Sequence, residues 1–372
     1  MSAGARWGFR LQKRVDIPRW LSVVVPLASV LGALVVGGIV VAVSGNDPFE
    51  TYSRILERGF TSEGALSATL TAATPLLFTG LAAAVAFRMG VFNIGGEGQF
   101  VMGAVASSWV GLQWGDTMGL GVMPLMVLAG FAAGWAYGAI PGLLRAYAST
   151  NEIITSLMLN YVAQLFASYL IFNSESFWRK LDGTGAVFPQ GKSLPLDAWW
   201  EPIELGSISV PLGFLLGVGA GVAVWVLYRV TRFGFEVNII GDSPQAARYA
   251  GMRTRRKIVM VLGLSGGLAG IGGASDIGDI RHVLDPKGLG QAGYGYAGIV
   301  VAALARLNPL AIIPVSVLMG GLANAGRALQ GPDFPAGLVG TLQGLVLFFA
   351  LGGEVLARYR IRRHHRVPAV AS

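Results

Sequence analysis

The sequence has no cysteine, little charge and few histidines, and each shortage excludes a class of chemistry. Without cysteine the chain has no disulfide framework and no thiolate ligands for a metal. Charged residues make up only 13% of the 372 positions, against roughly 25% in soluble domains. Of the three histidines, His364 and His365 lie in a basic segment near the end of the chain, and the third is His282. We therefore predict no metal site and no histidine-based catalytic centre.

The remaining composition is that of an all-α polytopic membrane protein. Hydrophobic residues account for 53% of the chain and form continuous runs, and a run of about 20 is long enough to cross a bilayer. We expect about ten transmembrane helices, over residues 21–43, 65–87, 95–113, 119–144, 151–172, 209–230, 258–275, 293–306, 309–326 and 336–353.

The basic residues predict which side of the membrane each loop faces. With the N-terminus inside and the spans threaded alternately, 20 of the 28 Lys and Arg residues fall on the cytoplasmic side. Cytoplasmic loops carry an excess of Lys and Arg, so both termini are predicted to be cytoplasmic. The chain then divides into a basic tail (1–20), a single transmembrane domain (21–353) and a second basic tail (354–372).

The predicted outer segments differ in kind. Residues 44–64 fit a short amphipathic helix at the membrane interface. Residues 173–208 are rich in Trp, Pro and Gly, and their tryptophans Trp178, Trp199 and Trp200 are suited to the headgroup level. We interpret this second segment as a cap or docking ledge.

Small residues recur on one face of the fourth predicted span. Gly130, Gly134, Gly138 and Gly142 are each four positions apart, which leaves a smooth stripe along a helix. Such a stripe lets a second helix approach closely. Close packing is the preferred interpretation, and a permeation path lined by these glycines is the alternative.

Residues that would hydrolyse ATP or carry protons are not evident in the spans. The stretch Ala186–Ser193, "AVFPQGKS", fails as a phosphate-binding loop because its first glycine is replaced and no strand precedes it. Nearly all acids fall in loops or at span ends, so the mid-membrane polar groups are predicted to be amides and hydroxyls. Candidate solute contacts are Asn160, Gln164, Asn324 and Gln343. Hydrogen bonding between helices is the alternative role for each of them.

The stretch Val91–Phe100, "VFNIGGEGQF", places an amide, an acid and several glycines at the predicted start of the third span. Asn93 can cap a helix there, and Glu97 would lie in the first turn, where the helix dipole favours an anion. We place this stretch at the cytoplasmic membrane surface. Helix-end chemistry explains its polarity, and an inner gate formed by Asn93, Glu97 and Gln99 is the functional alternative.

The longest predicted cytoplasmic segment, residues 231–257, contains signals for a short helix outside the membrane. Asp242 or Ser243 can act as N-cap, Pro244 suits the first helical position, and Gly251 supplies a stop. A short helix tied at both ends to long spans can transmit force. A plain basic loop that fixes the topology is the alternative, and the residues alone do not separate the two.

Three separated motifs resemble those of one family of transport proteins. They are "VFNIGGEGQFVMGA", "GFEVNIIGDSPQAARYAGM" and "GYGYAGIVVAALARLNP", and they occur in this order along the chain. The resemblance is to membrane permease subunits of bacterial ABC importers, of the ribose/branched-chain amino acid permease family. Within that family the "NIGGEGQ" form is closer to the nucleoside branch than to the simple-sugar branch.

The resemblance implies a non-catalytic permease in the bacterial cytoplasmic membrane. Its partners would be cytoplasmic ABC ATPase subunits, which bind the ATP and Mg, a second permease subunit, identical or paralogous, and an extracellular solute-binding lipoprotein. The chain itself would hold no cofactor and bind no nucleic acid. The helix that couples to the ATPase would fall on Gly241, Asp242, Pro244, Ala246, Ala247, Arg248 and Gly251.

Three other functions are weighed against import. A secondary transporter driven by an ion gradient would need a buried titratable site, which the sequence does not indicate. An exporter of the same architecture would lack a binding-protein partner. An intramembrane enzyme would need a nucleophile and base, or a set of metal ligands, and neither is visible.

Overall fold

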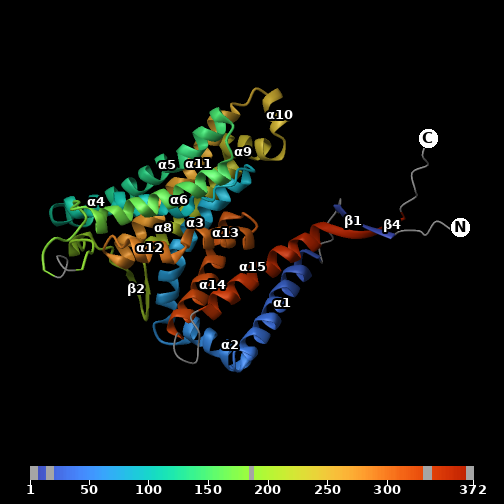
Figure 1. Cartoon of the computed structure of the whole chain (residues 1–372), viewed down its shortest axis with the longest axis horizontal. Helices are drawn as coiled ribbons and strands as arrows, with labels where there is room; N and C mark the ends of the chain where they lie inside the picture. The colour runs from blue at the N-terminus through green and yellow to red at the C-terminus, as the bar shows by residue number, and fades with distance from the viewer. Residues whose placement is uncertain (1–6, 14–20, 184–187, 330–336, 366–372) are drawn as a thin grey trace. The chain divides into compact units, whose positions relative to one another are not determined.

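The computed structural model describes residues 7–13, 21–183, 188–329 and 337–365, most of which are helical. The chain forms two compact units, one made of Met1–Ser53 and Gln330–Ser372, the other of Arg54–Leu329. Figure 1 shows the course of the chain and the element labels.

The first unit joins the beginning of the chain to its end. Its elements are strand β1 (Trp7–Lys13), helix α1 (Leu21–Val43), helix α15 (Gly337–Arg358) and strand β4 (Tyr359–His365), and α2 (Pro48–Leu56) leads from it into the second unit. The side chains of Leu342 and Phe349 on α15 fill the space beside glycines of α1. The strands pair antiparallel, Trp7 opposite His365 and Lys13 opposite Tyr359. Each segment predicted as a basic tail therefore contains a strand.

The second unit contains the remaining helices. In chain order its elements are η1 (Glu57–Thr61), α3 (Ala65–Arg88), α4 (Gly96–Met118), η2 (Gly119–Gly121), α5 (Val122–Ala148), α6 (Glu152–Ser168), η3 (Tyr169–Asn173), η4 (Leu196–Ala198), β2 (Ile203–Leu205), β3 (Ile208–Val210), α8 (Leu212–Val230), α9 (Arg232–Asp242), α10 (Pro244–Tyr249), α11 (Thr254–Ser275), η5 (Asp276–Arg281), α12 (Pro286–Ala292), α13 (Tyr294–Leu304) and α14 (Pro309–Ala328).

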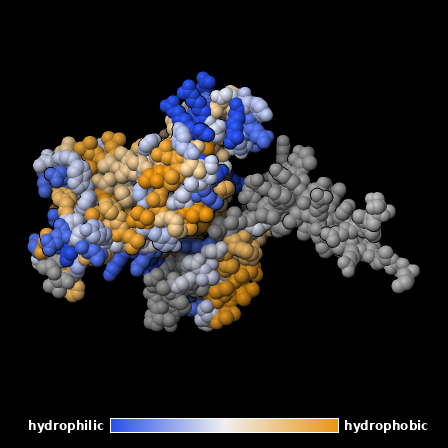
Figure 2. All heavy atoms as spheres, turned by 45° about the horizontal axis from the view of Figure 1, so that its top comes forward, coloured by the Kyte–Doolittle hydropathy of each residue, from blue (hydrophilic) through white to orange (hydrophobic). Residues whose placement is uncertain are grey.

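The long helices of the second unit run side by side, with polar elements at their ends. In Figure 1, α9 and α10 lie at one end of α5 and α11, and the segment that follows η3 lies at the other. Hydrophobic side chains cover much of the flank between these ends, whereas hydrophilic ones gather at the ends themselves (Figure 2). This is the pattern expected of a membrane-spanning unit.

The described part of the chain is mostly helical, which is compatible with the predicted all-α polytopic fold, and its helices differ in whether they are long and apolar enough to span a membrane. Each of the ten predicted segments contains a helix. Within the described residues six helices are long and apolar enough to cross a membrane, and a seventh span is possible if α1 and the helix after it count as one span bent by 115°. Helix α13 has 11 residues, which is about 17 Å and too short for a layer of roughly 30 Å. The predicted span 293–306 is thus a half-length helix.

The glycine stripe of α5 packs directly on α11, as the preferred interpretation predicted. A Cβ atom added at Gly134 would meet the carbonyl oxygen of Gly266, and one added at Gly130 would lie 2.7 Å from the carbonyl oxygen of Gly270. Gly270 also faces Gly103 of α4, so three helices approach backbone to backbone at one level. The stripe is filled by a neighbouring helix and is not an open surface.

We predict that Gly134→Ala destabilises the protein. The added methyl group would force α5 and α11 apart, and overpacking of this kind costs about 1–3 kcal/mol. The measurement is the thermal unfolding temperature of the purified chain in detergent. Gly219→Ala on α8 is the matched control, because a Cβ atom there meets nothing within 4 Å and alanine favours the helix. Equal unfolding temperatures for the two variants would contradict the proposed packing.

Candidate functional site

The chain turns back on itself after α3. The amide of Val91 donates to the carbonyl oxygen of Ala86 (3.3 Å), and Gly90 between them adopts a left-handed conformation with φ of 73°. The next residues then run back beside the helix they have just left, and α4 begins at Gly96.

The start of α4 lies well inside the helical layer. The amide of Gly98 donates to Asn160 Oδ1 (2.8 Å), and Asn160 lies eight residues into α6, which is about 12 Å. Asn93 Nδ2 donates to Ser265 Oγ (2.8 Å), midway along α11. The stretch therefore lies deeper among the helices than the helix ends at which it was predicted to lie. Hydropathy did not reveal the reversal at Gly90, which carries the chain back inward.

Side-chain amides satisfy the backbone around this entry. Asn93 and Gln99 form two hydrogen bonds with each other (2.8 and 3.1 Å), and Asn93 Oδ1 accepts from the amide of Gly95. Asn160 Nδ2 donates to the carbonyl oxygen of Ile94 (2.9 Å). The N-cap of α4 is Gly95 without a side-chain hydrogen bond, so Asn93 closes the preceding turn instead of capping the helix as predicted.

Glu97 joins the first turns of two helices. It lies in the first turn of α4, as predicted, and its Oε2 accepts a hydrogen bond from the amide of Gly295 at the start of α13 (2.6 Å). The N-terminal ends of both helices carry partial positive charge, which favours a carboxylate between them. A Cβ atom at Gly295 would collide with the backbone of Glu97, so only glycine fits there. Sequence reasoning missed this contact. The feature that could have indicated it is the glycine-rich stretch "GYGYAG", which precedes a short apolar run.

Three acids are buried among the described residues, against the expectation of amides and hydroxyls alone. Glu97 is 4% exposed, Glu152 is 6% exposed and pairs with Arg145, and Asp276 is fully buried. Asp276 pairs with Arg281, whose Nε lies 2.6 Å from Oδ2, and the guanidinium also reaches Asp285 at 3.6 Å. All three acids thus have partners within the fold. Apolar runs predicted the positions of the spans in the sequence, but they could not show which helix ends lie inside the helical layer.

The four candidate solute contacts have different surroundings. Asn160 belongs to the network around α4. Asn324 donates to carbonyl oxygens of Arg58 and Ala65 (both 3.3 Å), which ties α14 to the start of α3. Gln164 lies against Gly290, and its Nε2 has no hydrogen-bond partner in the described part of the chain. Gln343 lies on α15, in the first unit.

The predicted short helix outside the membrane is α10. Ser243 is its N-cap and accepts from the amide of Ala246 (3.4 Å), and Pro244 occupies the first helical position. Gly251 follows with φ of 71°, the conformation that ends helices. Asp242 instead closes α9. Of the seven residues implied as coupling contacts, Ala247 is fully buried, whereas Asp242, Pro244, Ala246, Arg248 and Gly251 are exposed and Gly241 is partly exposed.

An ion pair holds the base of α9 to α11. Lys257 Nζ lies 2.8 Å from Glu236 Oε2, and Arg232 contacts the other carboxylate oxygen at 3.1 Å. The hydrogen bond from Lys257, with the charges of both bases, lowers the pKa of Glu236. A lowered pKa means that the pair stabilises the fold at neutral pH and loses that effect as the pH falls through the folded-state pKa. This pair anchors the segment that carries α10.

Residues 173–208 and 276–292 are the two outer ledges that the family resemblance implies as a docking surface for the binding protein, and they pack on each other at the opposite end of the unit. The amide of Leu194 donates to the carbonyl oxygen of His282 (2.8 Å), and that of Trp200 to Gly278 (3.0 Å). The ring of Trp199 stacks on His282 with centroids 3.7 Å apart, and burial lowers the pKa of this imidazole. Trp200 is 3% exposed, so it is a buried anchor of this contact.

These features define a class before any comparison is made. Two helices, α4 and the half-length α13, have N-terminal ends that meet inside an apolar unit with polar elements at both ends. Helices that begin inside the layer in this way are typical of multi-pass membrane transporters. Comparison with known proteins identifies the family. The chain belongs to the family described as branched-chain amino acid transport system / permease component, whose model matches residues 65–351. It is accordingly a multi-pass protein of the cell membrane.

Similar proteins come from both archaea and bacteria. The chain is 35% identical to the glucose ABC transporter permease protein TsgB13 of Haloferax volcanii, over 98% of this chain and 97% of the relative. It is 31% identical to the guanosine ABC transporter permease protein NupP of Bacillus subtilis, over 93% and 96%. The nucleoside ABC transporter permease protein NupB of Lactococcus lactis is 28% identical over 88% and 90%.

We predict that Glu97→Ala destabilises the protein by about 1–3 kcal/mol, the cost of leaving a buried donor unpaired. Glu97→Gln keeps an oxygen for the amide of Gly295 and retains most of the stability. The measurement is the unfolding temperature in detergent. Asp116→Ala, an exposed acid on the same helix, is the control and should match the original protein. A Glu97→Ala variant as stable as the control would refute the role of this contact.

Proposed function

We propose that this chain is the permease subunit of an ATP-binding cassette importer that moves a neutral polar solute, in the first instance a nucleoside, into the cell. The family membership of residues 65–351 carries the proposal. The ATP and Mg belong to separate ATPase subunits, and a binding lipoprotein delivers the solute from outside. A second permease subunit, identical or paralogous, completes the path.

We propose that the chain crosses the membrane about ten times with both termini in the cytoplasm. The excess of Lys and Arg on one side supports this topology. So does the position of α10 and the basic residues around it, at the end of the unit opposite the outer ledges (Figure 1). The short helix α13 would cross only part of the layer, and α4 would begin at the depth at which the two helices meet.

Coupling to the ATPase is assigned to α10. Its capped ends fix its length, and its single buried side chain, Ala247, anchors it while the others face outward. The ion pair of Glu236 with Lys257 ties the adjacent segment to α11. Movement of α10 would therefore reach the packed core of α4, α5 and α11, and the spans would rearrange by alternating access.

The inner gate is assigned to Asn93, Glu97 and Gln99. Glu97 joins the entry of α4 to that of α13, and Asn93 joins Gln99 of α4 to Ser265 of α11. Movement of α4 away from either neighbour would have to break these hydrogen bonds. Uptake should be slower in Glu97→Gln, which loses the charge between the two helix ends. Unchanged uptake in that variant would leave these residues a purely structural role.

Two classes of solute are supported by the comparisons and the motif. Nucleosides are favoured by the "NIGGEGQ" motif and by the bacterial relatives named for guanosine and nucleoside transport. A simple sugar is the alternative, favoured by the 35% identity to the glucose permease. Ion-driven secondary transport has less support, because Glu97 and Asp276 are engaged with Gly295 and Arg281.

We predict that Arg248→Glu uncouples ATP hydrolysis from transport. The side chain is exposed on α10, so reversal of its charge should disturb the ATPase contact without unfolding the spans. We expect solute uptake by reconstituted vesicles to fall at least tenfold. Ala247→Asp, which places a charge at the buried anchor, should have the same effect.

The control for this experiment is Arg229→Glu, the same charge change at the end of α8, outside α10. It should retain uptake and assembly with the ATPase. Normal ATPase assembly together with normal uptake in both α10 variants would remove the coupling assignment.

The solute class can be determined with the partner lipoprotein. A ligand that binds the folded state raises the unfolding temperature, so guanosine and glucose can be compared directly on the purified binding protein. Stabilisation by guanosine alone supports the nucleoside assignment, and stabilisation by glucose alone replaces it with the sugar assignment.

A further inference from the structure

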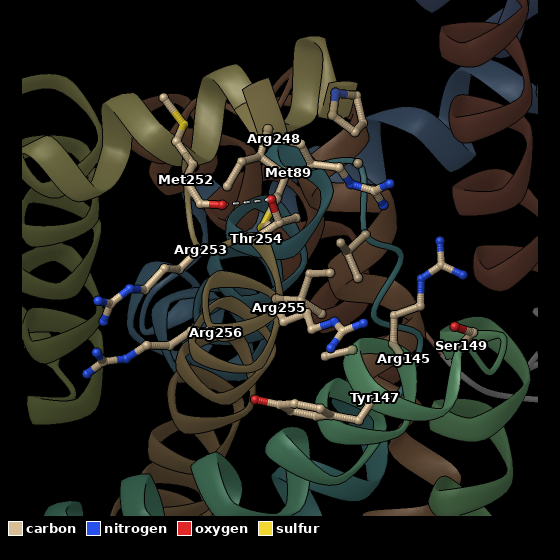
Figure 3. A pocket seen from close by; sticks show the side chains of 16 residues that line it. Met89, Arg145, Tyr147, Ser149, Arg248, Met252, Arg253, Thr254, Arg255 and Arg256 are labelled. Atoms are coloured by element: carbon tan, nitrogen blue, oxygen red, sulfur yellow. Dashed lines mark hydrogen bonds between the residues drawn. The ribbon is translucent and has the colours of Figure 1, made fainter. Parts of the chain in front are cut away.

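A large basic cavity lies beside α10. Its volume is about 980 Å³, and it opens between the end of α5, the turn after α3, α10 and the start of α11 (Figure 3). Five arginines line it and no acid does: Arg145, Arg248, Arg253, Arg255 and Arg256.

Three of the arginines converge on the same space. Figure 3 shows the guanidinium groups of Arg145, Arg248 and Arg255 around the opening, whereas those of Arg253 and Arg256 point away from it. Arg145 is paired with Glu152 at 3.3 Å. Arg248 and Arg255 form no ion pair within the described part of the chain, and Arg255 lies over the ring of Tyr147 at 5.8 Å.

The start of α11 adds to the positive field of the cavity. Arg253 is the N-cap of this helix, and it supplies no side-chain hydrogen bond to the first turn. The first amides of a helix attract anions when they lack such a cap. Arginine forks and helix N-termini both recognise phosphate, so a phosphate group is the ligand chemistry that this cavity fits.

An apolar stripe on α5 leads directly to the cavity. Ile140, Leu143, Leu144 and Tyr147 follow helical spacing, and their exposed fractions are 39%, 49%, 38% and 65%. Tyr147 also lines the cavity itself. A ligand that occupies both features carries a phosphate at one end and an apolar chain at the other.

We propose that this cavity binds the headgroup of an anionic phospholipid, whose acyl chain lies along the stripe of α5. Basic pockets between spans at the cytoplasmic surface are known to suit such headgroups. The inference rests on the proposed function only in placing this end of the unit in the cytoplasm. Because Arg248 belongs to α10, a bound lipid would steady the helix assigned to ATPase coupling and make transport depend on the lipid composition.

The test is a titration of the purified full chain with phosphatidylglycerol and with phosphatidylcholine, followed by native mass spectrometry. We expect phosphatidylglycerol to be retained preferentially. Arg255→Gln should weaken its retention about tenfold, close to the loss of one hydrogen bond to a charged group. Arg256→Gln is the matched control, since that guanidinium points away from the cavity (Figure 3), and it should bind as the original chain does. Arg145→Gln provides a second variant of the converging set.

Several outcomes would overturn the proposal. One is equal retention in Arg255→Gln and Arg256→Gln, and another is the absence of any preference over phosphatidylcholine. If inorganic phosphate at millimolar concentration displaced the lipid, the site would be assigned to a free phosphate compound. Loss of ATPase assembly in Arg255→Gln with unchanged lipid binding would assign it to an acidic surface of the ATPase. The titration needs neither ATPase nor solute, so failure of the coupling experiment would leave its result standing.

Discussion

A helix that begins inside an apolar layer is the constraint on which the polar residues of this protein depend. Every backbone group in such a layer needs a partner, because an unsatisfied one costs several kcal/mol. Here the chain re-enters after Gly90 and α4 starts at the level of Asn160. The side-chain amides of Asn93 and Asn160 supply hydrogen bonds to the backbone that water would supply at a membrane surface, and Gln99 bonds to Asn93.

The same constraint explains Glu97 and the close packing around it. Helix α13 also begins inside the unit, and Glu97 accepts the amide of Gly295 there, so one carboxylate serves two helix ends. This arrangement works only if the backbones come very close. Glycine allows this close approach at Gly295, and also at Gly270, which faces both Gly103 and Gly130. The hydrogen bonds to buried polar groups and the close glycine packing are thus two consequences of helices that begin inside the unit.

Much of the fold follows from local patterns in the sequence, and the misses have a common physical cause. Apolar runs locate the helices, cap chemistry at Ser243, Pro244 and Gly251 locates α10, and glycine spacing identifies the packed face of α5. Depth in the layer is not local information. The contact of Glu97 with Gly295 spans 198 residues, and hydropathy cannot detect that α4 begins after a reversal. The pairing of β1 with β4 joins the two ends of the chain and leaves no local signal either.

The hydrogen bonds within the fold also limit which polar side chains are free to bind a solute. The side-chain amide of Asn160 forms hydrogen bonds with Gly98, Ile94 and Tyr296, and that of Asn324 bonds to the start of α3. A hydrogen bond to solute from either would have to replace one that holds the fold. Gln164 differs, because its buried Nε2 lacks a partner among the described residues. Of the candidates in the second unit, it is the one whose engagement with a nucleoside or sugar costs the structure least.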